Sequence, residues 1–267
     1  MTTVTRRVKE VTQPRGGYIN PRSMRVKQLD DGKPSPLDHK IENLHPTLVG
    51  TAVDYLSRLA NGADPHDAFA VSLMGANNIG GAARTAAEVA VASLTPGKID
   101  GYAIIAACKL AGYDVGYRVG PAMYDPRART KPDKVTIDHI VTMVDRSVRF
   151  FREYGPITLD GFTFPGGYTD VVTAGDGDFL TSDTLWDFKV SVKSPTKDHT
   201  LQLLMYWLMG MHTGLSHFTG ITHLGVFNPR LNTVYRIAVA DISKEVIREV
   251  SIEVIGYEDY PQALVHR

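Results

Sequence analysis

The stretch GDGDFLTSDTLWDFKVS, residues 175–191, carries four aspartates and one lysine in a pattern typical of two short strands joined by a tight turn. In its second half, large apolar residues such as Trp186 alternate with polar residues such as Asp187, which is the period of two that a strand shows. The first half can pair back on this strand because Ser182 and Asp183 are residue types that favour a chain reversal. The stretch therefore predicts a β-hairpin with one apolar and one charged face.

The register of this hairpin brings charged residues together. A turn at 182–183 pairs Leu180 with Leu185, Phe179 with Trp186, Asp178 with Asp187 and Asp176 with Lys189. Directly opposed residues have Cβ atoms about 4.5 to 5.5 Å apart, and like charges at that distance destabilise a sheet. A divalent cation beside Asp178 and Asp187 would offset this repulsion.

Composition limits the classes of protein to consider. The chain has 267 residues, 43 % of them hydrophobic, and equal numbers of basic and acidic residues, 29 of each. This predicts an ordinary soluble globular protein without a global positive field. The single cysteine, Cys108, lies in an apolar stretch and is expected to be a small buried residue in a reducing compartment. No apolar run approaches the roughly 18 residues of a membrane span, so we expect a cytoplasmic protein.

Three parts are expected along the chain. Residues 1–44 are rich in Pro, Gly and basic residues and predict an extended basic arm over the surface. Residues 45–138 predict a helical region packed on the core, and residues 139–256 predict the core itself, all within one continuous unit. The periodicity predicts helices from Pro46 to about Gly62, over 80–97 and over 136–155, the last with a polar face that carries Arg146, Arg149 and Arg152. The second of these is apolar on nearly every side and is expected to be buried.

The second half of the chain is expected to follow the order helix, strand, strand, strand, helix, strand. Asp178 lies on the second strand, and Asp187-Phe188-Lys189 lies on the third. This arrangement resembles the PD-(D/E)xK nuclease superfamily over about residues 140–240. The next helix carries Gln202 and Tyr206, similar to the Gln-x-x-x-Tyr motif of the RecB-like branch, and residues one turn apart share a helix face. The resemblance implies an α/β fold with a mixed central β-sheet flanked by helices, the restriction-endonuclease-like core.

The resemblance also implies the residues of the site. The expected catalytic residues are Asp178, Asp187, Lys189, Gln202 and Tyr206. Asp178 and Asp187 would bind Mg²⁺ or Mn²⁺, since carboxylate oxygens are the hard ligands these ions prefer. Asp170 is a rival to Asp178, but only across a long loop, and Asp176 is expected to be a structural partner of Lys189.

The family places a further acid or histidine on the helix before the sheet, and three residues are candidates for it. Asp145 lies at the edge of the apolar stripe of the helix over 136–155 and is the preferred third metal ligand. Asp54 follows Gly50 as in a Gly-x-x-x-His motif with Asp for His, but it lies opposite the apolar stripe of its helix. Glu88 is the one acid in the Ala-rich helix and needs a partner if it is buried.

Local basic patches are expected to bind the substrate backbone, because the chain as a whole is neutral. The candidates are Arg127 and Arg129 in a loop, and Lys193 and Lys197 just after the charged strand. The expected function is a metal-dependent deoxyribonuclease that acts on single- or double-stranded DNA, as an exonuclease in repair, recombination or phage defence. The alternatives are a non-catalytic nucleic-acid-binding or scaffold protein on the same fold, and a metal-dependent hydrolase of small phosphate esters. A protein partner or a second copy of the chain is expected at the helical region.

Overall fold

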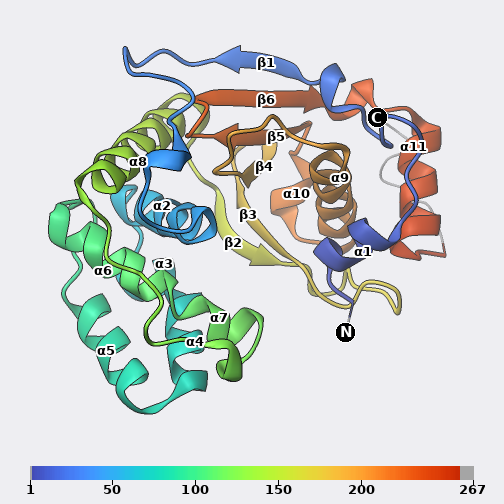
Figure 1. Cartoon of the computed structure of the whole chain (residues 1–267). Helices are drawn as coiled ribbons and strands as arrows, with labels where there is room; N and C mark the ends of the chain where they lie inside the picture. Colours follow the sequence, from blue (N-terminus) through green and yellow to red (C-terminus); the bar gives the residue numbers. More distant parts are fainter. Residues whose placement is uncertain (1, 259–267) are drawn as a thin grey trace.

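The computed structural model describes residues 2–258, and its centre is a six-stranded mixed β-sheet flanked by helices (Figure 1). The strand order is β1-β6-β5-β4-β3-β2, in which β4 and β5 are parallel and the other neighbours are antiparallel. The strands are β1 (Arg25–Gln28), β2 (Leu159–Thr163), β3 (Asp176–Leu180), β4 (Thr184–Phe188), β5 (His223–Asn228) and β6 (Thr233–Ala238). The predicted α/β class with a mixed central sheet is confirmed.

Helices precede, connect and follow the strands. The α-helices are α1 (Val4–Glu10), α2 (Pro46–Ala60), α3 (Pro65–Ala68), α4 (Ala70–Ile79), α5 (Gly81–Ala92), α6 (Gly101–Ala111), α7 (Asp114–Arg118), α8 (Lys134–Tyr154), α9 (Lys197–His212), α10 (Ser216–Thr219) and α11 (Lys244–Glu249). Short 3₁₀ turns are η1 (Pro21–Ser23), η2 (His39–Ile41), η3 (Pro121–Met123) and η4 (Val239–Asp241), and α11 continues into a π-helical segment, η5 (Val250–Ile255). None of the helices within residues 2–258 has both the length and the apolar content of a membrane span.

The two faces of the sheet belong to two hydrophobic cores. Trp186, Phe188 and Phe227 pack with α2, α6 and α8, whereas Leu185 and Leu224 pack with α1, α9 and α11 on the other face. The alternation along β4 therefore divides its side chains between two buried layers, as the period of two requires. Helices α3 to α7 form a further group outside α2 (Figure 1).

The helix ends follow local sequence chemistry. Helix α2 begins at Pro46, a residue favoured in a first turn, and α8 begins after Asp133, whose side chain accepts from the Thr136 amide. Helix α9 begins with a capping box between Thr196 and His199. Because these features are local, the predicted helices at 46–62 and 136–155 and the helix with Gln202 are found close to the expected residues.

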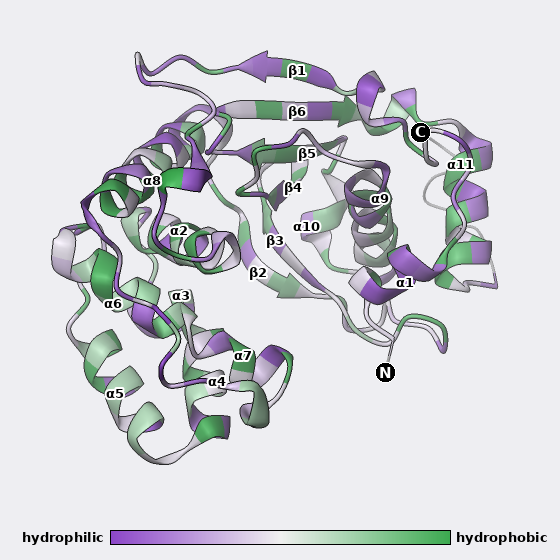
Figure 2. Ribbon diagram, in the orientation of Figure 1, coloured by the Kyte–Doolittle hydropathy of each residue, from purple (hydrophilic) through white to green (hydrophobic). Residues whose placement is uncertain are grey.

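The arm at 1–44 does more than cover the surface, because it supplies an edge strand. All four residues of β1 are exposed, yet they pair with β6 from Arg25 opposite Arg236 to Gln28 opposite Thr233. Figure 2 shows β1 as mostly hydrophilic, a composition that discourages pairing with further strands. The pairing with β6 had no sequence pattern to predict it.

Two buried ion pairs fix the end of the arm. Arg146 of α8 binds Asp31 through Nε and Nη2 at 2.7 and 3.2 Å. Arg230, in the β5–β6 turn, binds Glu42 through Nη1 and Nη2 at 2.6 and 3.0 Å. Arg146 was expected on a polar helix face with Arg149, but only 1 % of Arg146 is exposed. That expectation was wrong because the arm crosses this face of α8 and covers the arginine.

The helix over 80–97 also differs from expectation. Helix α5 buries Ala83, Ala87, Ala90 and Val91, but Glu88 is exposed and Val89 is 64 % exposed. The prediction of a helix buried on all sides was wrong because alanine is compatible with either environment. Glu88 therefore needs no buried partner. Helix α8 runs across the expected boundary at 138–139, so the helical region and the core share an element.

Candidate active site

The charged hairpin forms with the predicted register. Two of the four predicted pairs are found across β3 and β4, Phe179 with Trp186 and Leu180 with Leu185. Asp178 lies close to Asp187, because the charge of Asp187 acts on it. Asp178 Oδ2 accepts a hydrogen bond of 2.6 Å from the backbone N–H of Phe188. The two carboxylates therefore lie together at the open end of the hairpin, away from its turn.

Asp187 is buried with one oxygen satisfied and the other not. Lys189 Nζ donates to Asp187 Oδ1 at 2.7 Å, and the Asp187 side chain is 3 % exposed. Its second oxygen, Oδ2, is buried and has no hydrogen-bond partner among the described residues. A buried acceptor without a donor or cation costs free energy. The expected pairing of Lys189 with Asp176 is not found, because Lys189 forms its ion pair with the aspartate two residues before it. The backbone of Asp176 pairs with Thr163 of β2.

Burial and neighbouring charges shift the pKa values of Asp178 and Lys189. Burial raises the pKa of Asp178 to about 8, helped by the carboxylates of Asp187 and Asp54 and opposed by Lys189. Burial disfavours the charged form of Lys189, but Asp187 and Asp178 outweigh it and raise the pKa of the lysine. Lys189 is therefore an ammonium group at neutral pH, and a further positive charge near Asp178 would be needed to ionise that carboxyl fully.

Helix α9 turns three polar side chains toward the hairpin. Gln202 Nε2 donates to Tyr206 Oη at 2.8 Å, so these residues share a helix face as predicted. Burial and the charges of Asp176 and Asp187 raise the pKa of Tyr206 well above its usual value. His199, one turn before Gln202, has a pKa lowered by burial, and the charges of Asp187 and Lys189 also act on it.

Asp54 of α2 is an acid on a preceding helix whose charge acts on Asp178 and Lys189 of the hairpin. Burial raises its pKa to about 6, as does the charge of Asp160, while Arg58, Arg118 and Lys189 oppose the shift. Asp54 also contributes to the raised pKa of Asp178, so the two groups interact.

The preferred candidate, Asp145, lies elsewhere. Its side chain is 56 % exposed on α8, and its Oδ2 is 3.8 Å from Lys33 Nζ in the arm. Glu88 is exposed on α5. The structure therefore brings Asp54 toward Asp178 and Asp187, but not Asp145 or Glu88.

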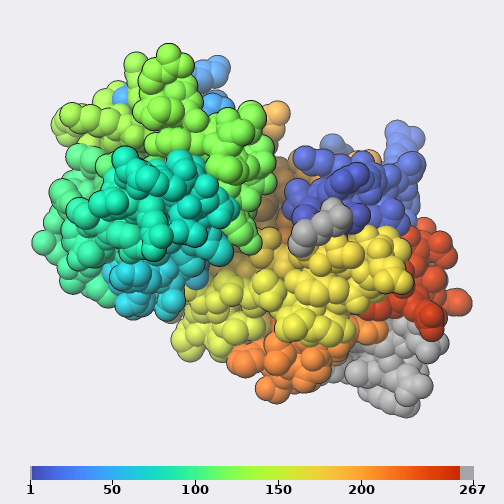
Figure 3. Space-filling model, turned by 90° about the horizontal axis from the view of Figure 1, so that it is seen from below, coloured from blue at the N-terminus to red at the C-terminus, as the bar shows by residue number. Residues whose placement is uncertain are grey.

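Asp54, Asp160 and Asp178 line a cleft of about 980 Å³ between the helical region and the sheet. Figure 3 shows this hollow between the cyan and green atoms of the helical region and the yellow atoms of the segments after residue 155. Its charged lining consists of six aspartates and two arginines: Asp54, Asp64, Asp67, Asp160, Asp176, Asp178, Arg58 and Arg118. A polyanion can approach such a surface only if cations offset the excess negative charge.

The four basic residues expected to bind substrate do not line the cleft. Lys193 and Lys197 are exposed at the end of the loop that leads into α9. Arg127 and Arg129 are exposed in the loop before α8, where Arg127 lies 3.3 Å from Asp125. The basic side chains that do line it, Arg58 and Arg118, had no assigned role.

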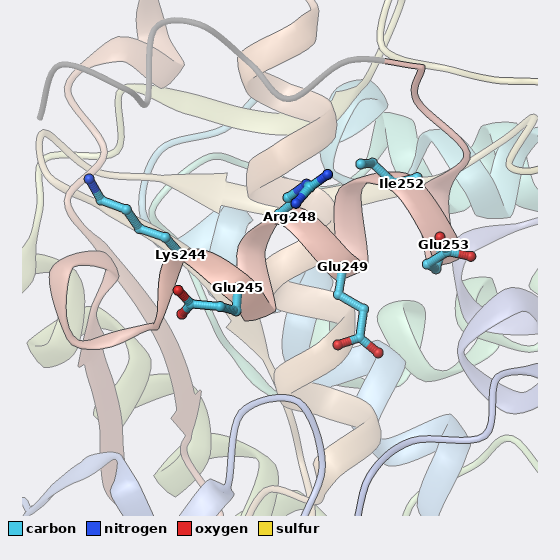
Figure 4. Close-up of a pocket in the computed structure, with 6 residues that line it drawn as sticks. All are labelled: Lys244, Glu245, Arg248, Glu249, Ile252 and Glu253. Atoms are coloured by element: carbon cyan, nitrogen blue, oxygen red, sulfur yellow. The ribbon is translucent and has the colours of Figure 1, made fainter.

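A second hollow, of about 360 Å³, lies on the outer side of α11 and η5 (Figure 4). Five of the six residues that line it are exposed, and Lys244, Arg248 and Glu249 extend away from the helix as labelled sticks. It is a depression in a charged helix surface rather than an enclosed site. The cleft at Asp178 is the candidate active site. Of the five residues expected to be catalytic, Asp178 lines it, whereas Asp187, Lys189, Gln202 and Tyr206 are not among its lining residues.

Sequence reasoning missed Arg58, Asp160, Arg118 and His199. Arg58 follows Asp54 by four residues, so the sequence predicts that the two side chains share one helix face. His199 precedes Gln202 by three residues, and the same spacing rule could have found it. For Asp160 and Arg118, the sequence contains no pattern that joins them to the hairpin.

The described residues do not contain a cluster of three or more His, Cys, Asp or Glu side chains that could hold a metal ion. The acids of the hairpin are a pair, Asp178 and Asp187, and Asp54 lines the same cleft as Asp178. Comparison of the chain with models of known protein families, with curated protein sequences and with solved structures found no match.

Proposed function

We propose that this chain is a Mg²⁺- or Mn²⁺-dependent nuclease of the PD-(D/E)xK type that hydrolyses phosphodiester bonds in DNA. The observation that carries the proposal is Asp187 Oδ2, a buried carboxylate oxygen without a hydrogen-bond partner in the part of the chain that the structure describes, close to a second carboxyl at Asp178. A buried carboxylate oxygen without a partner costs free energy, and a cation bound there would offset this cost and allow Asp178 to ionise. Lys189 supplies one positive charge, but it binds the other oxygen of Asp187.

The residues present fit a hard divalent ion. Mg²⁺ keeps several waters and is commonly held by one or two carboxylates together with substrate phosphate oxygens. Asp178 and Asp187 would hold it, and the charge of Asp54, which acts on Asp178, would add to the attraction for a cation. When bound, such an ion supplies charge stabilisation at the phosphate and lowers the pKa of a bound water.

The other side chains of the site have separate roles. Lys189, kept charged by Asp187, would orient a water for attack and stabilise negative charge that develops on the phosphate. Tyr206, whose hydroxyl keeps its proton at neutral pH, can donate to a phosphate oxygen while it accepts from Gln202. Both functions require side chains held in place before the substrate arrives. The ion pair with Asp187 of β4 holds Lys189, and burial in α9 holds Tyr206.

The test is cleavage of labelled linear and circular DNA, each single- and double-stranded, with Mg²⁺, Mn²⁺ or EDTA. We expect cutting with either ion and none with EDTA. Asp187→Asn and Lys189→Met, which preserve side-chain size, should each abolish cutting. Cutting of linear but not circular DNA would identify an exonuclease.

Asp145→Asn is the matched control, since it removes one exposed carboxylate from α8 and should leave the cutting rate unchanged. Thermal unfolding of each variant checks that the fold is retained. Metal-independent cutting, or full activity in Asp187→Asn, would disprove the proposal. DNA binding without cutting under any of these conditions would favour a scaffold protein instead.

A second candidate, hydrolysis of small phosphate esters, is favoured by the size of the cleft. Its volume of about 980 Å³ lies at the upper end of the range that small-molecule pockets occupy. The same proteins assayed with nucleoside mono- and triphosphates separate the two functions. Release of phosphate from nucleotides with no cutting of DNA would replace the first candidate by the second.

A further inference from the structure

Helix α7 is held against α4 by two glycines. A Cβ on Gly75 would lie 2.0 Å from the backbone oxygen of Tyr113, and one on Gly116 would lie 2.5 Å from the backbone oxygen of Gly75. Any larger residue at either position would push the two helices apart. The position of α7 relative to the rest of the helical region is therefore set by direct backbone contact.

A buried carboxylate fixes α7 relative to α2 as well. Asp114, 5 % exposed, accepts hydrogen bonds from Tyr55 Oη at 2.6 Å and from Ser72 Oγ at 2.7 Å. It also accepts from Arg118 Nε at 3.3 Å, four residues later on α7. A satisfied buried network of this kind makes one arrangement of its members much more stable than others. Asp114 thus positions the arginine side chain at the end of α7.

The two residues at the end of α7, Tyr117 and Arg118, line the same cleft as Asp178. Tyr117 is 53 % exposed, and the side chain of Arg118 is 51 % exposed. Arg58, the other arginine of the cleft, is only 21 % exposed and is occupied by Asp160 at 2.9 Å. Arg118 is therefore the better placed of the two arginines to meet an anionic ligand.

Arg118 is also within electrostatic reach of the acidic side of the cleft. Its charge lowers the pKa of Asp54, against the raising effect of burial, and Asp176 is among the groups that raise the pKa of Arg118 itself. Tyr117 and Arg118 therefore offer an aromatic surface and a phosphate-binding group in the cleft that Asp178 also lines. Val71 and Met74 of α4 extend this surface with apolar contacts.

We propose that α7 is the wall that binds a nucleic-acid strand with unpaired bases, through Arg118 on a phosphate and Tyr117 stacked on a base. The inference rests on the proposed nuclease function and adds the substrate class. A base can stack on Tyr117 only if it is free of its own helix, and the cleft has room for a few nucleotides but not for a duplex. Arg118 offsets the acids on the opposite side of the cleft for the phosphate that it binds.

The test measures binding of a fluorescent oligothymidine by anisotropy with Mg²⁺, in the Lys189→Met background so that the strand is not cut. Tyr117→Ala should weaken binding by about tenfold, the effect expected for the loss of one stacked base. Tyr117→Phe should restore it to within about twofold, because the ring and not the hydroxyl carries the stacking. Tyr102→Ala is the matched control, since Tyr102 is 58 % exposed on α6 and does not line the cleft.

A blunt-ended DNA hairpin of fully paired sequence serves as the second ligand. We expect its affinity to be the same for the Lys189→Met protein and for the variant that also carries Tyr117→Ala. Equal effects of Tyr117→Ala and Tyr102→Ala on oligothymidine, or no binding of oligothymidine at all, would overturn the proposal. The proposal would also be overturned if Tyr117→Ala lowered the affinity for the fully paired DNA hairpin as much as it lowers the affinity for oligothymidine.

The outcome is distinguishable from failure of the nuclease proposal. Tyr117-dependent strand binding by a protein that cuts no DNA would support the role of α7 and reject the nuclease. Suppose instead that the protein with Lys189 intact cuts DNA only with a divalent ion, and that Tyr117→Ala changes neither cutting nor strand binding. This result would support the nuclease and reject the role of α7. Arg118→Met gives an independent measurement. Its affinity for oligothymidine should be lower than that of the protein with Arg118, and the difference should become smaller as the salt concentration is raised, because the variant lacks a phosphate contact.

Discussion

Arg58 Nε in α2 donates a hydrogen bond of 2.9 Å to Asp160 Oδ2 in β2, and this bond joins the helical region to the edge of the sheet at the cleft. Asp54 lies one turn before Arg58 on the same helix, so the bond also fixes the distance of Asp54 from the hairpin acids. The proposed function therefore makes Asp54 of α2, and not Asp145 of α8, the expected helix-borne acid of the site.

Asp54→Asn is therefore expected to weaken Mn²⁺ binding by roughly tenfold to a hundredfold, the effect of losing a group that organises a metal site. Titration of the protein with Mn²⁺ followed by electron paramagnetic resonance measures the affinity directly. Asp145→Asn removes the same charge from α8 and should leave the affinity unchanged. The reverse ranking of the two variants would place the site nearer to α8.

The free energy of unfolding should depend on pH through Asp178. Its pKa is raised from 3.8 to about 8, so in the folded metal-free protein the carboxyl keeps a proton that the unfolded chain releases. The stability contributed by this group is complete below pH 4 and is lost as the pH rises toward 8. In EDTA, Asp178→Asn should be more stable relative to wild type at pH 8 than at pH 5, measured by urea unfolding. A difference independent of pH would show that Asp178 is ionised in the folded protein throughout.

Binding of DNA in the cleft should require a divalent ion, because six aspartates and two arginines line it. For the Lys189→Met protein, we expect the affinity for a labelled single strand to fall at least tenfold when EDTA replaces Mg²⁺. An equivalent ionic strength of NaCl controls for screening. Equal affinity in EDTA would mean that the strand binds outside the cleft, where Lys193, Lys197, Arg127 and Arg129 are exposed.

The buried ion pairs of the arm should contribute strongly to stability. Arg230→Met leaves Glu42, whose side chain is fully buried, with His139 as its remaining partner, and should lower the free energy of unfolding by about 3–5 kcal/mol. Urea unfolding at neutral pH measures this. Arg149→Met removes an exposed arginine from α8 and should change stability by less than about 0.5 kcal/mol.

The contact between α4 and α7 predicts a contrast between two glycines. Gly75→Ala should destabilise the protein by about 1–3 kcal/mol, because the new Cβ would overlap the backbone of Tyr113. Gly101→Ala, at the first residue of α6, meets nothing within 4 Å and should be neutral or slightly stabilising. Thermal unfolding compares the two. Similar effects at both positions would show that the α4–α7 contact yields easily.

The sequence by itself determined the elements and the local geometry of the site. The pairs nearest the hairpin turn, Phe179 with Trp186 and Leu180 with Leu185, were predictable because strand alternation and turn chemistry are local. The same pattern predicted that Asp178 and Asp187 lie close together. The pairing of Gln202 with Tyr206 was predictable for the same reason, since residues four apart in a helix are neighbours. The comparisons found no match, so the resemblance to PD-(D/E)xK nucleases depends on these local features.

Only the tertiary structure decided which distant residues meet. The apolar stripe of α2 predicted a solvated Asp54, but a polar helix face can line a cleft when another element approaches it, as β2 does through Asp160. Arg146 had the pattern of an exposed residue and is buried because the arm crosses it. Periodicity reports how a helix is divided between polar and apolar sides, whereas the partner of each side depends on packing between segments far apart in the chain.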